Sequence, residues 1–103
     1  MQGGAPASVW FDLGLARQDL RDHGGASQAY RKAIELEPDR AEAQLNLGVV
    51  LQESGDLDGA MRAYAQAYRL RSESFGTIAM ALTSASHGRL WLDEASLRRA
   101  LDG

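Results

Sequence analysis

Apolar residues recur every three or four positions along most of the chain, for example at Leu47, Gly48 and Leu51. This spacing is the period of an α-helix, and no stretch between residues 7 and 102 sustains the alternation of apolar and polar residues typical of strands. The pattern breaks where glycines gather, at Gly24–Gly25, Gly55 and Gly88. We therefore predict an all-α fold of about six helices, each about three turns long, arranged as antiparallel hairpins.

Composition supports this pattern and excludes several classes of protein. Only two of the 103 residues are proline, and 45% are hydrophobic against 24% charged, as in a single globular domain. The absence of cysteine excludes a disulfide framework and a thiolate metal site. No apolar run reaches the roughly 20 residues of a membrane span, and the N-terminus lacks the features of a signal peptide, so we expect a cytoplasmic chain without membrane contact. The net charge of −3 argues against nucleic acid as a partner.

The chain repeats itself at a period of 34 residues. Residues 41–74 match residues 7–40 without a gap at eleven positions. The identical pairs are Ala7/Ala41, Leu13/Leu47, Gly14/Gly48, Gln18/Gln52, Asp22/Asp56, Gly25/Gly59, Ala26/Ala60, Ala29/Ala63, Tyr30/Tyr64, Ala33/Ala67 and Leu36/Leu70. A fixed period of this length is typical of stacked repeats. We predict two units, 7–40 and 41–74, preceded by a flexible segment 1–6.

The repeated residues suggest how each unit packs. Gly14 and Gly48 fall on the first helices, and we expect Ala26 and Ala60 of the second helices to face them, since small side chains let helix axes approach closely. Volume beside this contact would come from Trp10, Leu13, Leu45 and Leu47, and further along the same faces from Tyr30, Tyr64, Ala33 and Ala67. Pro38 would end the first unit, because the residue before a proline is disfavoured in a helix.

This arrangement resembles the tetratricopeptide repeat over residues 7–74. The first unit carries signature residues of that family at Trp10, Leu13, Gly14, Ala26, Tyr30, Ala33 and Pro38. The second unit carries Leu47, Gly48, Gly55, Ala60, Tyr64 and Ala67. The sequence departs from the family pattern at Arg17, Gln44 and Ser72, where a large apolar residue, an aromatic residue and a proline are usual. The resemblance implies helix-turn-helix units stacked into a short right-handed solenoid.

Residues 75–103 resemble the repeat less closely, and we interpret them as a degenerate third helix pair that caps the stack. Ser86–His87–Gly88 interrupts the helical spacing, and Asp93 is predicted to cap a last helix. Two roles remain open for Trp91. It would either cover the end of the stack or form a recognition element with residues 88–92.

No group of residues indicates catalysis, so we expect a protein that is not an enzyme and uses no cofactor. There is no cysteine nucleophile, and no glycine loop follows a strand to cradle a phosphate. His23 and His87 adjoin glycines and are expected to be turn residues. Asp19, Asp22 and His23 have a spacing compatible with a metal ligand set, but we interpret them as a polar helix end and predict no metal site.

The resemblance implies that the first helices of the units line a concave groove that holds a peptide. The groove residues would be Phe11, Leu15, Gln18, Leu45, Asn46, Val49, Gln52, Glu53 and Met80. One subclass of the family grips acidic chaperone C-termini with a Lys and an Asn where this chain has Phe11 and Leu15, so we predict no such clamp. The groove is instead apolar, which suits an amphipathic helix or an extended apolar peptide.

Two functions are compatible with these observations. The first is a non-catalytic protein–protein interaction module, a scaffold or adaptor that binds a protein or peptide partner in the groove. The alternative is a self-assembling helical-repeat protein whose groove or end mediates a homo-oligomer, because so short a stack gains burial by pairing. The fold alone does not select between them.

Overall fold

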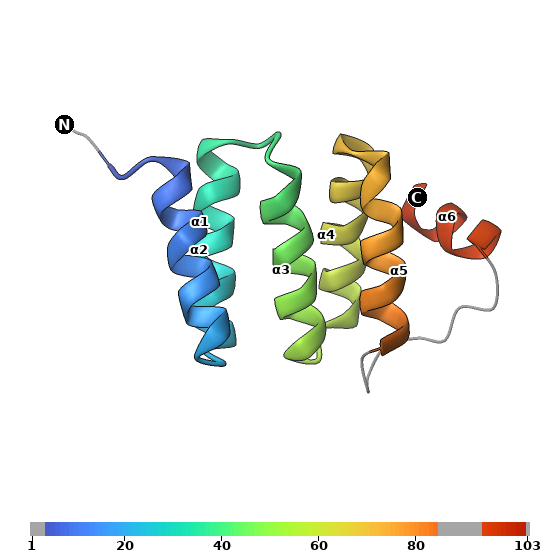
Figure 1. Ribbon diagram of the computed structural model, residues 1–103, viewed down its shortest axis with the longest axis horizontal. Helices are drawn as coiled ribbons and strands as arrows, with labels where there is room; N and C mark the ends of the chain where they lie inside the picture. Colours follow the sequence, from blue (N-terminus) through green and yellow to red (C-terminus); the bar gives the residue numbers. More distant parts are fainter. Residues whose placement is uncertain (1–3, 85–93, 103) are drawn as a thin grey trace.

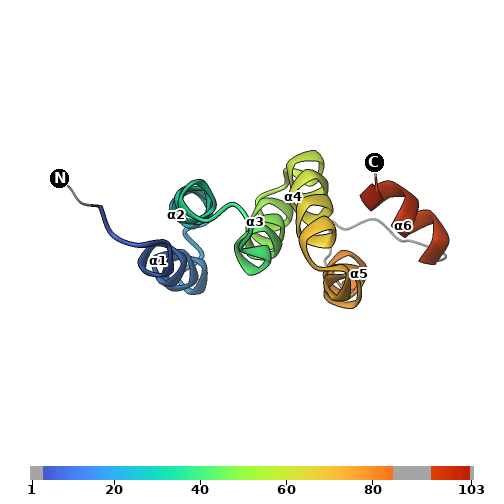
Figure 2. The same ribbon diagram turned by 90° about the horizontal axis from the view of Figure 1, so that it is seen from above.

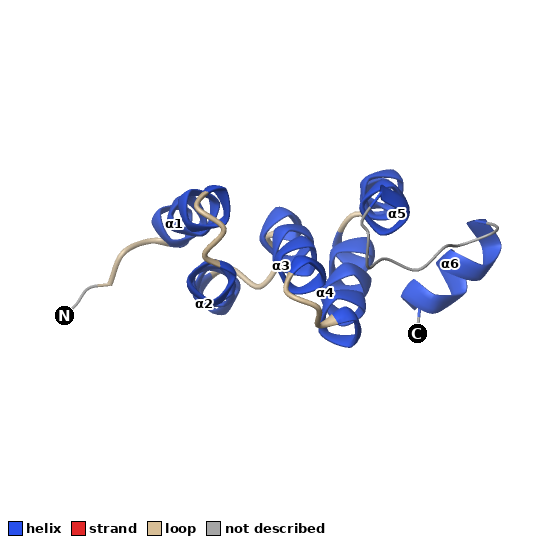
Figure 3. Cartoon of the chain, turned by 90° about the horizontal axis from the view of Figure 1, so that it is seen from below, coloured by secondary structure: helices blue, strands red, loops and turns tan. Residues whose placement is uncertain are grey.

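The computed structural model describes residues 4–84 and 94–102, and all regular structure in this part of the chain is helical (Figures 1 and 3). The elements are α1 (Ala7–Asp19), α2 (His23–Leu36), α3 (Ala41–Glu53), α4 (Leu57–Leu70), the 3₁₀ turn η1 (Ser72–Ser74), α5 (Phe75–Ser84) and α6 (Glu94–Asp102). The all-α prediction and the two predicted hairpins are confirmed.

The helices lie in two rows along an elongated molecule of 49 × 26 × 18 Å. Figure 2 shows α1, α3 and α5 in one row and α2 and α4 in the other. Within the two hairpins, α1 packs on α2 and α3 packs on α4. The two units are joined where α2 packs on α3, and α6 packs on α4. We call the outer surface of α1, α3 and α5 the A face, and the outer surface of α2 and α4 the B face.

The second helix of each unit begins with the same cap. The carboxylate of Asp22 accepts a hydrogen bond from the Gly25 N–H at 3.0 Å, and Asp56 accepts one from Gly59 at 2.9 Å. A Cβ atom on either glycine would collide with the capping carboxylate, which explains why the aspartate and the glycine recur together. Gly24 and Gly25 thus lie in the first turn of α2 and not between the helices, which corrects the predicted break.

The turn inside each hairpin has a left-handed residue at the equivalent position. Arg21 has a φ of 63° in the first unit, and Gly55 has a φ of 95° in the second. Their N–H groups donate to the carbonyls of Gln18 at 2.9 Å and of Gln52 at 3.1 Å, so the two turns share one hydrogen-bond pattern. Glycine adopts this backbone without cost, whereas a side chain such as that of Arg21 costs about 1 kcal/mol or more.

Tyrosine rings fill the contact between the two helices of each unit. A Cβ atom on Gly14 would lie 2.5 Å from the ring of Tyr30, and one on Gly48 would lie 2.5 Å from the ring of Tyr64. Both rings are completely buried. The alanines predicted opposite the glycines are fully buried in the same core, but the rings are the nearest groups. Each glycine therefore provides the space that a ring occupies.

Among the described helices, α1 packs mainly on α2, and α2 packs on α1 and α3, so the outer side chains of α1 are correspondingly exposed. Leu13 is 36% exposed, whereas its counterpart Leu47 is 5% exposed because α2 packs against α3. Trp10 and Leu13 line an open cavity of about 310 Å³ together with Arg17. The prediction that Leu13 supplies interior volume is therefore wrong, whereas Trp10 is half-buried and packs against the cluster of Ala7, Ala33 and Ala43.

The C-terminal helix closes the opposite end of the core. Leu97 and Leu101 of α6 are 2% and 0% exposed and join the same cluster as Tyr64 and Ile78. The predicted break at Ser86–His87–Gly88, the cap at Asp93 and both roles of Trp91 lie outside the described residues. Among the described residues, no helix combines the length and the apolar character needed to cross a membrane.

Candidate partner-binding face

Apolar side chains of α1, α3 and α5 are accessible on the A face. Leu15 of α1 is 39% exposed and Met80 of α5 is 71% exposed. Between them in the sequence, Leu45 and Val49 of α3 are half-buried and pack against the core, which fixes their positions. Leu45 also lines a cavity of about 240 Å³ between α3 and the start of α5. These four predicted groove residues are at least partly exposed to solvent.

Phe11 is partly occupied by neighbours within the protein. Its ring centroid lies 5.8 Å from that of Tyr30, and the guanidinium carbon of Arg40 lies 5.3 Å from the centre of the Phe11 ring. Arg40 is itself held by a hydrogen bond from its Nε to Glu37 at 2.9 Å. Phe11 is therefore half-buried, and the Arg40 guanidinium already packs on its ring through a cation–π contact.

Two of the predicted groove residues, Gln18 and Gln52, hold the tyrosines in place. The Tyr30 hydroxyl donates to Gln18 Oε1 at 2.6 Å, and the Tyr64 hydroxyl donates to Gln52 Oε1 at 2.7 Å. Gln52 also donates from Nε2 to the Ala81 carbonyl at 3.0 Å and is only 3% exposed. Gln52 is thus an internal residue that ties α3 to α4 and α5, and it cannot offer its amide to a partner in this structure.

The sequence analysis did not predict these glutamine–tyrosine hydrogen bonds, which we call the glutamine–tyrosine tie of each unit. The signal was present, because a glutamine precedes a tyrosine by 12 residues in both units. A buried tyrosine hydroxyl needs a hydrogen-bond partner, so an identical polar residue at a fixed offset is a candidate for that role.

Asn46 and Glu53 lie near the contact between the two units. Asn46 is half-buried beside the Tyr30 hydroxyl, and Glu53 is exposed at the end of α3. The Nε2 atom of His23 lies 3.7 Å from a carboxylate oxygen of Glu53. His23 therefore contacts the second unit. It is the first residue of α2, which corrects the expectation that it lies in a turn.

Burial changes the acidity of the two internal tyrosines. Burial raises the pKa of Tyr30 to about 12, with the Asn46 amide acting in the opposite direction and the Asp19 charge adding to the increase. Burial, together with the negative charge of Glu53, raises the pKa of Tyr64 even further. Both phenols therefore stay neutral in the folded protein at a pH where an exposed tyrosine ionises.

We predict that the protein loses stability as the pH rises above about 10, the ordinary pKa of tyrosine. The unfolded chain releases both phenolic protons there, whereas the folded protein retains them, so proton loss favours unfolding. The stabilising contribution that Tyr30 makes to the free energy of unfolding is fully present below pH 10, and it is lost as the pH rises through about 12, the pKa of Tyr30 in the folded protein. Urea unfolding at a series of pH values measures this loss. The Tyr30→Phe/Tyr64→Phe variant is the control and should lose most of the dependence, and equal slopes in the two proteins would contradict the assignment.

Asp22, one of the two carboxylates considered for a metal site, has a structural role. Asp22 caps α2 and pairs with Arg17 at 2.7 Å, and the Gly25 N–H and the Arg17 guanidinium hold the pKa of Asp22 below its usual value. Across residues 4–84 and 94–102, no three His, Cys, Asp or Glu side chains are placed to hold a metal ion.

Stacked helix-turn-helix units with an accessible face along the first helices define a helical-repeat protein. A family model described as tetratricopeptide repeat matches residues 11–75, and the chain belongs to this family. No match to the chain was found among curated proteins. Tetratricopeptide repeats generally mediate protein–protein interaction, and the family is typically non-catalytic.

Proposed function

We propose that this protein is a non-catalytic scaffold or adaptor that binds an apolar helix or an extended apolar segment of a partner on its A face. The observation that carries the proposal is the set of accessible apolar side chains on α1, α3 and α5, namely Leu15, Leu45, Val49 and Met80. Accessible apolar surface of this kind usually marks an interaction site.

The surroundings of these side chains suit an amphipathic partner. The partner would place apolar residues one helical turn apart against Leu15, Leu45 and Val49, which is the helix-in-groove mode of recognition. Four acidic residues and a single arginine lie on α1 and α3, so basic residues at the edge of the partner segment would be favoured. The charge decides the orientation and the rate of binding more than the affinity.

The test compares the wild type with the Leu45→Glu/Val49→Glu variant. We expect the wild type to capture a partner from a lysate of the source cells, and the purified partner to bind the variant at least tenfold more weakly, because two carboxylates would face its apolar side chains. The matched control is Leu36→Glu/Leu70→Glu, which changes two exposed leucines at the ends of α2 and α4. Circular dichroism establishes that all three proteins are folded.

Each outcome has a defined meaning. Binding that the control keeps and the A-face variant loses supports the proposal. Equal binding by all three proteins would show that the partner contacts another surface. A wild-type mass that rises with concentration, and that the A-face variant reduces to the monomer, would replace the proposed partner by a second copy of the chain.

A further inference from the structure

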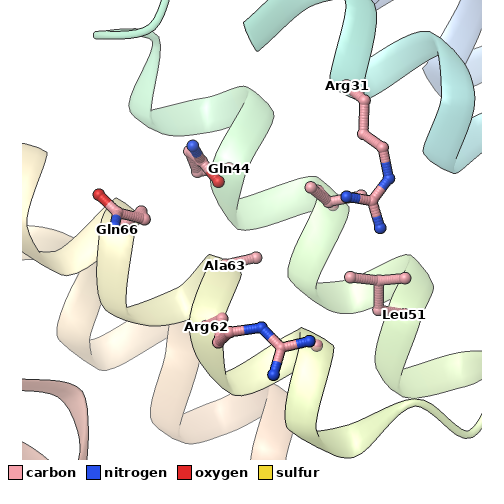
Figure 4. Close-up of a pocket in the computed structure, with 8 residues that line it drawn as sticks. Arg31, Gln44, Leu51, Arg62, Ala63 and Gln66 are labelled. Atoms are coloured by element: carbon pink, nitrogen blue, oxygen red, sulfur yellow. The ribbon is translucent and has the colours of Figure 1, made fainter. Parts of the chain in front are cut away.

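A second candidate site lies on the B side of the molecule, where α2, α3 and α4 meet (Figure 4). A cavity of about 160 Å³ opens there, at the junction of the two units. Its polar side chains come from all three helices and are Arg31, Gln44, Arg62 and Gln66. Leu47 and Leu51 of α3 supply its apolar part, and both are buried.

The charge in this cavity has one sign. The residues that line it include two arginines and no acidic residue. Within the described part of the chain, neither Arg31 nor Arg62 forms an ion pair, although each has an acidic residue one turn away on its own helix. Glu35 pairs with Lys32 at 3.0 Å and not with Arg31, and Asp58 lies outside ion-pair distance of Arg62. Both guanidinium groups are therefore available to an anion from outside.

The setting makes these guanidinium groups good receptors for a carboxylate. Figure 4 shows Arg31 reaching from α2 and Arg62 from α4 toward the space beside Leu51. A guanidinium binds a carboxylate through two parallel hydrogen bonds. Arg31 and Arg62 are both exposed, so a carboxylate from another molecule can reach them. The amides of Gln44 and Gln66 add further donors at the edge.

The cationic surface continues along α4. A second cavity of about 390 Å³ shares Arg62 and Gln66 with the first and adds Arg69, with Met61 and Ala100 as apolar lining. The helices α2 and α4 carry four lysine or arginine residues against two acidic ones. On α1 and α3 the ratio is reversed, with one arginine against four acidic residues. The two rows of helices therefore differ in the sign of their net charge.

We infer that the B face binds an acidic peptide segment of a protein partner, with one carboxylate held between Arg31 and Arg62 and a further one near Arg69. The cavity at the junction, of about 160 Å³, is large enough to admit the end of an aspartate or glutamate side chain. This site is separate from the A face and does not depend on the function proposed there.

The test is titration of the ¹⁵N-labelled 11.1 kDa protein with a peptide of six glutamates, followed by NMR. We expect saturable shifts of the side-chain Nε–H resonances of Arg31 and Arg62 and of the backbone amides around them. The Arg31→Gln/Arg62→Gln variant should bind at least tenfold more weakly. The control Arg21→Gln/Arg71→Gln removes the same charge from exposed residues outside both cavities and should bind within twofold of the wild type.

Further arms separate this proposal from its alternatives. A peptide of six glutamines should cause no saturable shift, and the Leu45→Glu/Val49→Glu variant should bind the acidic peptide as the wild type does. Inorganic phosphate is titrated at the same ionic strength as a comparison. If phosphate shifts the same resonances with the same affinity as the glutamate peptide, the site binds small anions and the peptide proposal is overturned. Absent or scattered shifts, or equal weakening by the control variant, would show that Arg31 and Arg62 only cover the apolar junction with their side chains.

Discussion

Tyr64→Ala is expected to lower the free energy of unfolding by about 3–5 kcal/mol, the usual cost of removing a large buried ring. The Tyr64 ring is 0% exposed and lies against Gly48, which has no side chain to fill the space left behind. The variant also leaves Gln52 Oε1 without its donor at 2.7 Å. Because a domain of this size has only roughly 5–15 kcal/mol of stability in total, the melting temperature should fall by about 12 °C or more.

Tyr64→Phe separates the ring from its hydroxyl. It keeps the packing against Gly48 and removes only the hydrogen bond to Gln52, so we expect a loss of about 1 kcal/mol. Urea unfolding followed by circular dichroism measures both variants. A loss for Tyr64→Ala no larger than that for Tyr64→Phe would contradict the view that the ring carries the packing of this unit.

Gly48→Ala is expected to lower the free energy of unfolding by a net amount of up to about 2 kcal/mol, because overpacking a core costs about 1–3 kcal/mol and the better helix propensity of alanine offsets about 1 kcal/mol. The new Cβ would lie 2.5 Å from Tyr64 Cδ1, so the ring or the helix must move. The ring cannot move freely, because the Tyr64 hydroxyl is held by Gln52. The gain in helix propensity that alanine normally brings over glycine therefore offsets only part of the cost of this collision.

Gly76→Ala provides the matched control with the opposite sign. Gly76 lies inside α5, is exposed, and a Cβ atom there would meet nothing within 4 Å. Only the propensity term remains, so this variant should gain about 0.5–1 kcal/mol. Thermal melts of the two variants against the wild type test the pair. A stabilised Gly48→Ala protein would show that α3 and α4 can separate at this point without cost.

The hairpins and the repeat could be predicted because their signals are local. The 34-residue period fixes which residues are equivalent, and the helical spacing fixes which of them share a face. The partner of each glycine could not be predicted in this way. Whether Gly48 meets Ala60 or Tyr64 depends on the rotation of α4 about its axis, which only the packed structure determines.

The candidate site was predicted less completely, for a related reason. Equivalence between units places Gln18 and Gln52 on the first helices but does not say whether a side chain turns outward or back onto its own hairpin. The repeat also does not reveal the cationic cavity on the B face, because Arg31 and Arg62 lie in different units and line one cavity only where the units stack. The exposed residues Leu15 and Met80 were identified because the family resemblance places first-helix positions on one face.

The glutamine–tyrosine tie also has a consequence for how the chain folds. Each tie joins residues only 12 positions apart, so a hairpin can close before any contact between units forms. Chains dominated by such short-range contacts fold on a time scale of roughly microseconds to milliseconds. The second unit has an additional bond from Gln52 to Ala81, 29 positions away, and neighbours on both sides. Its amides should therefore exchange with solvent most slowly, while the first hairpin opens and closes many times before the whole chain unfolds.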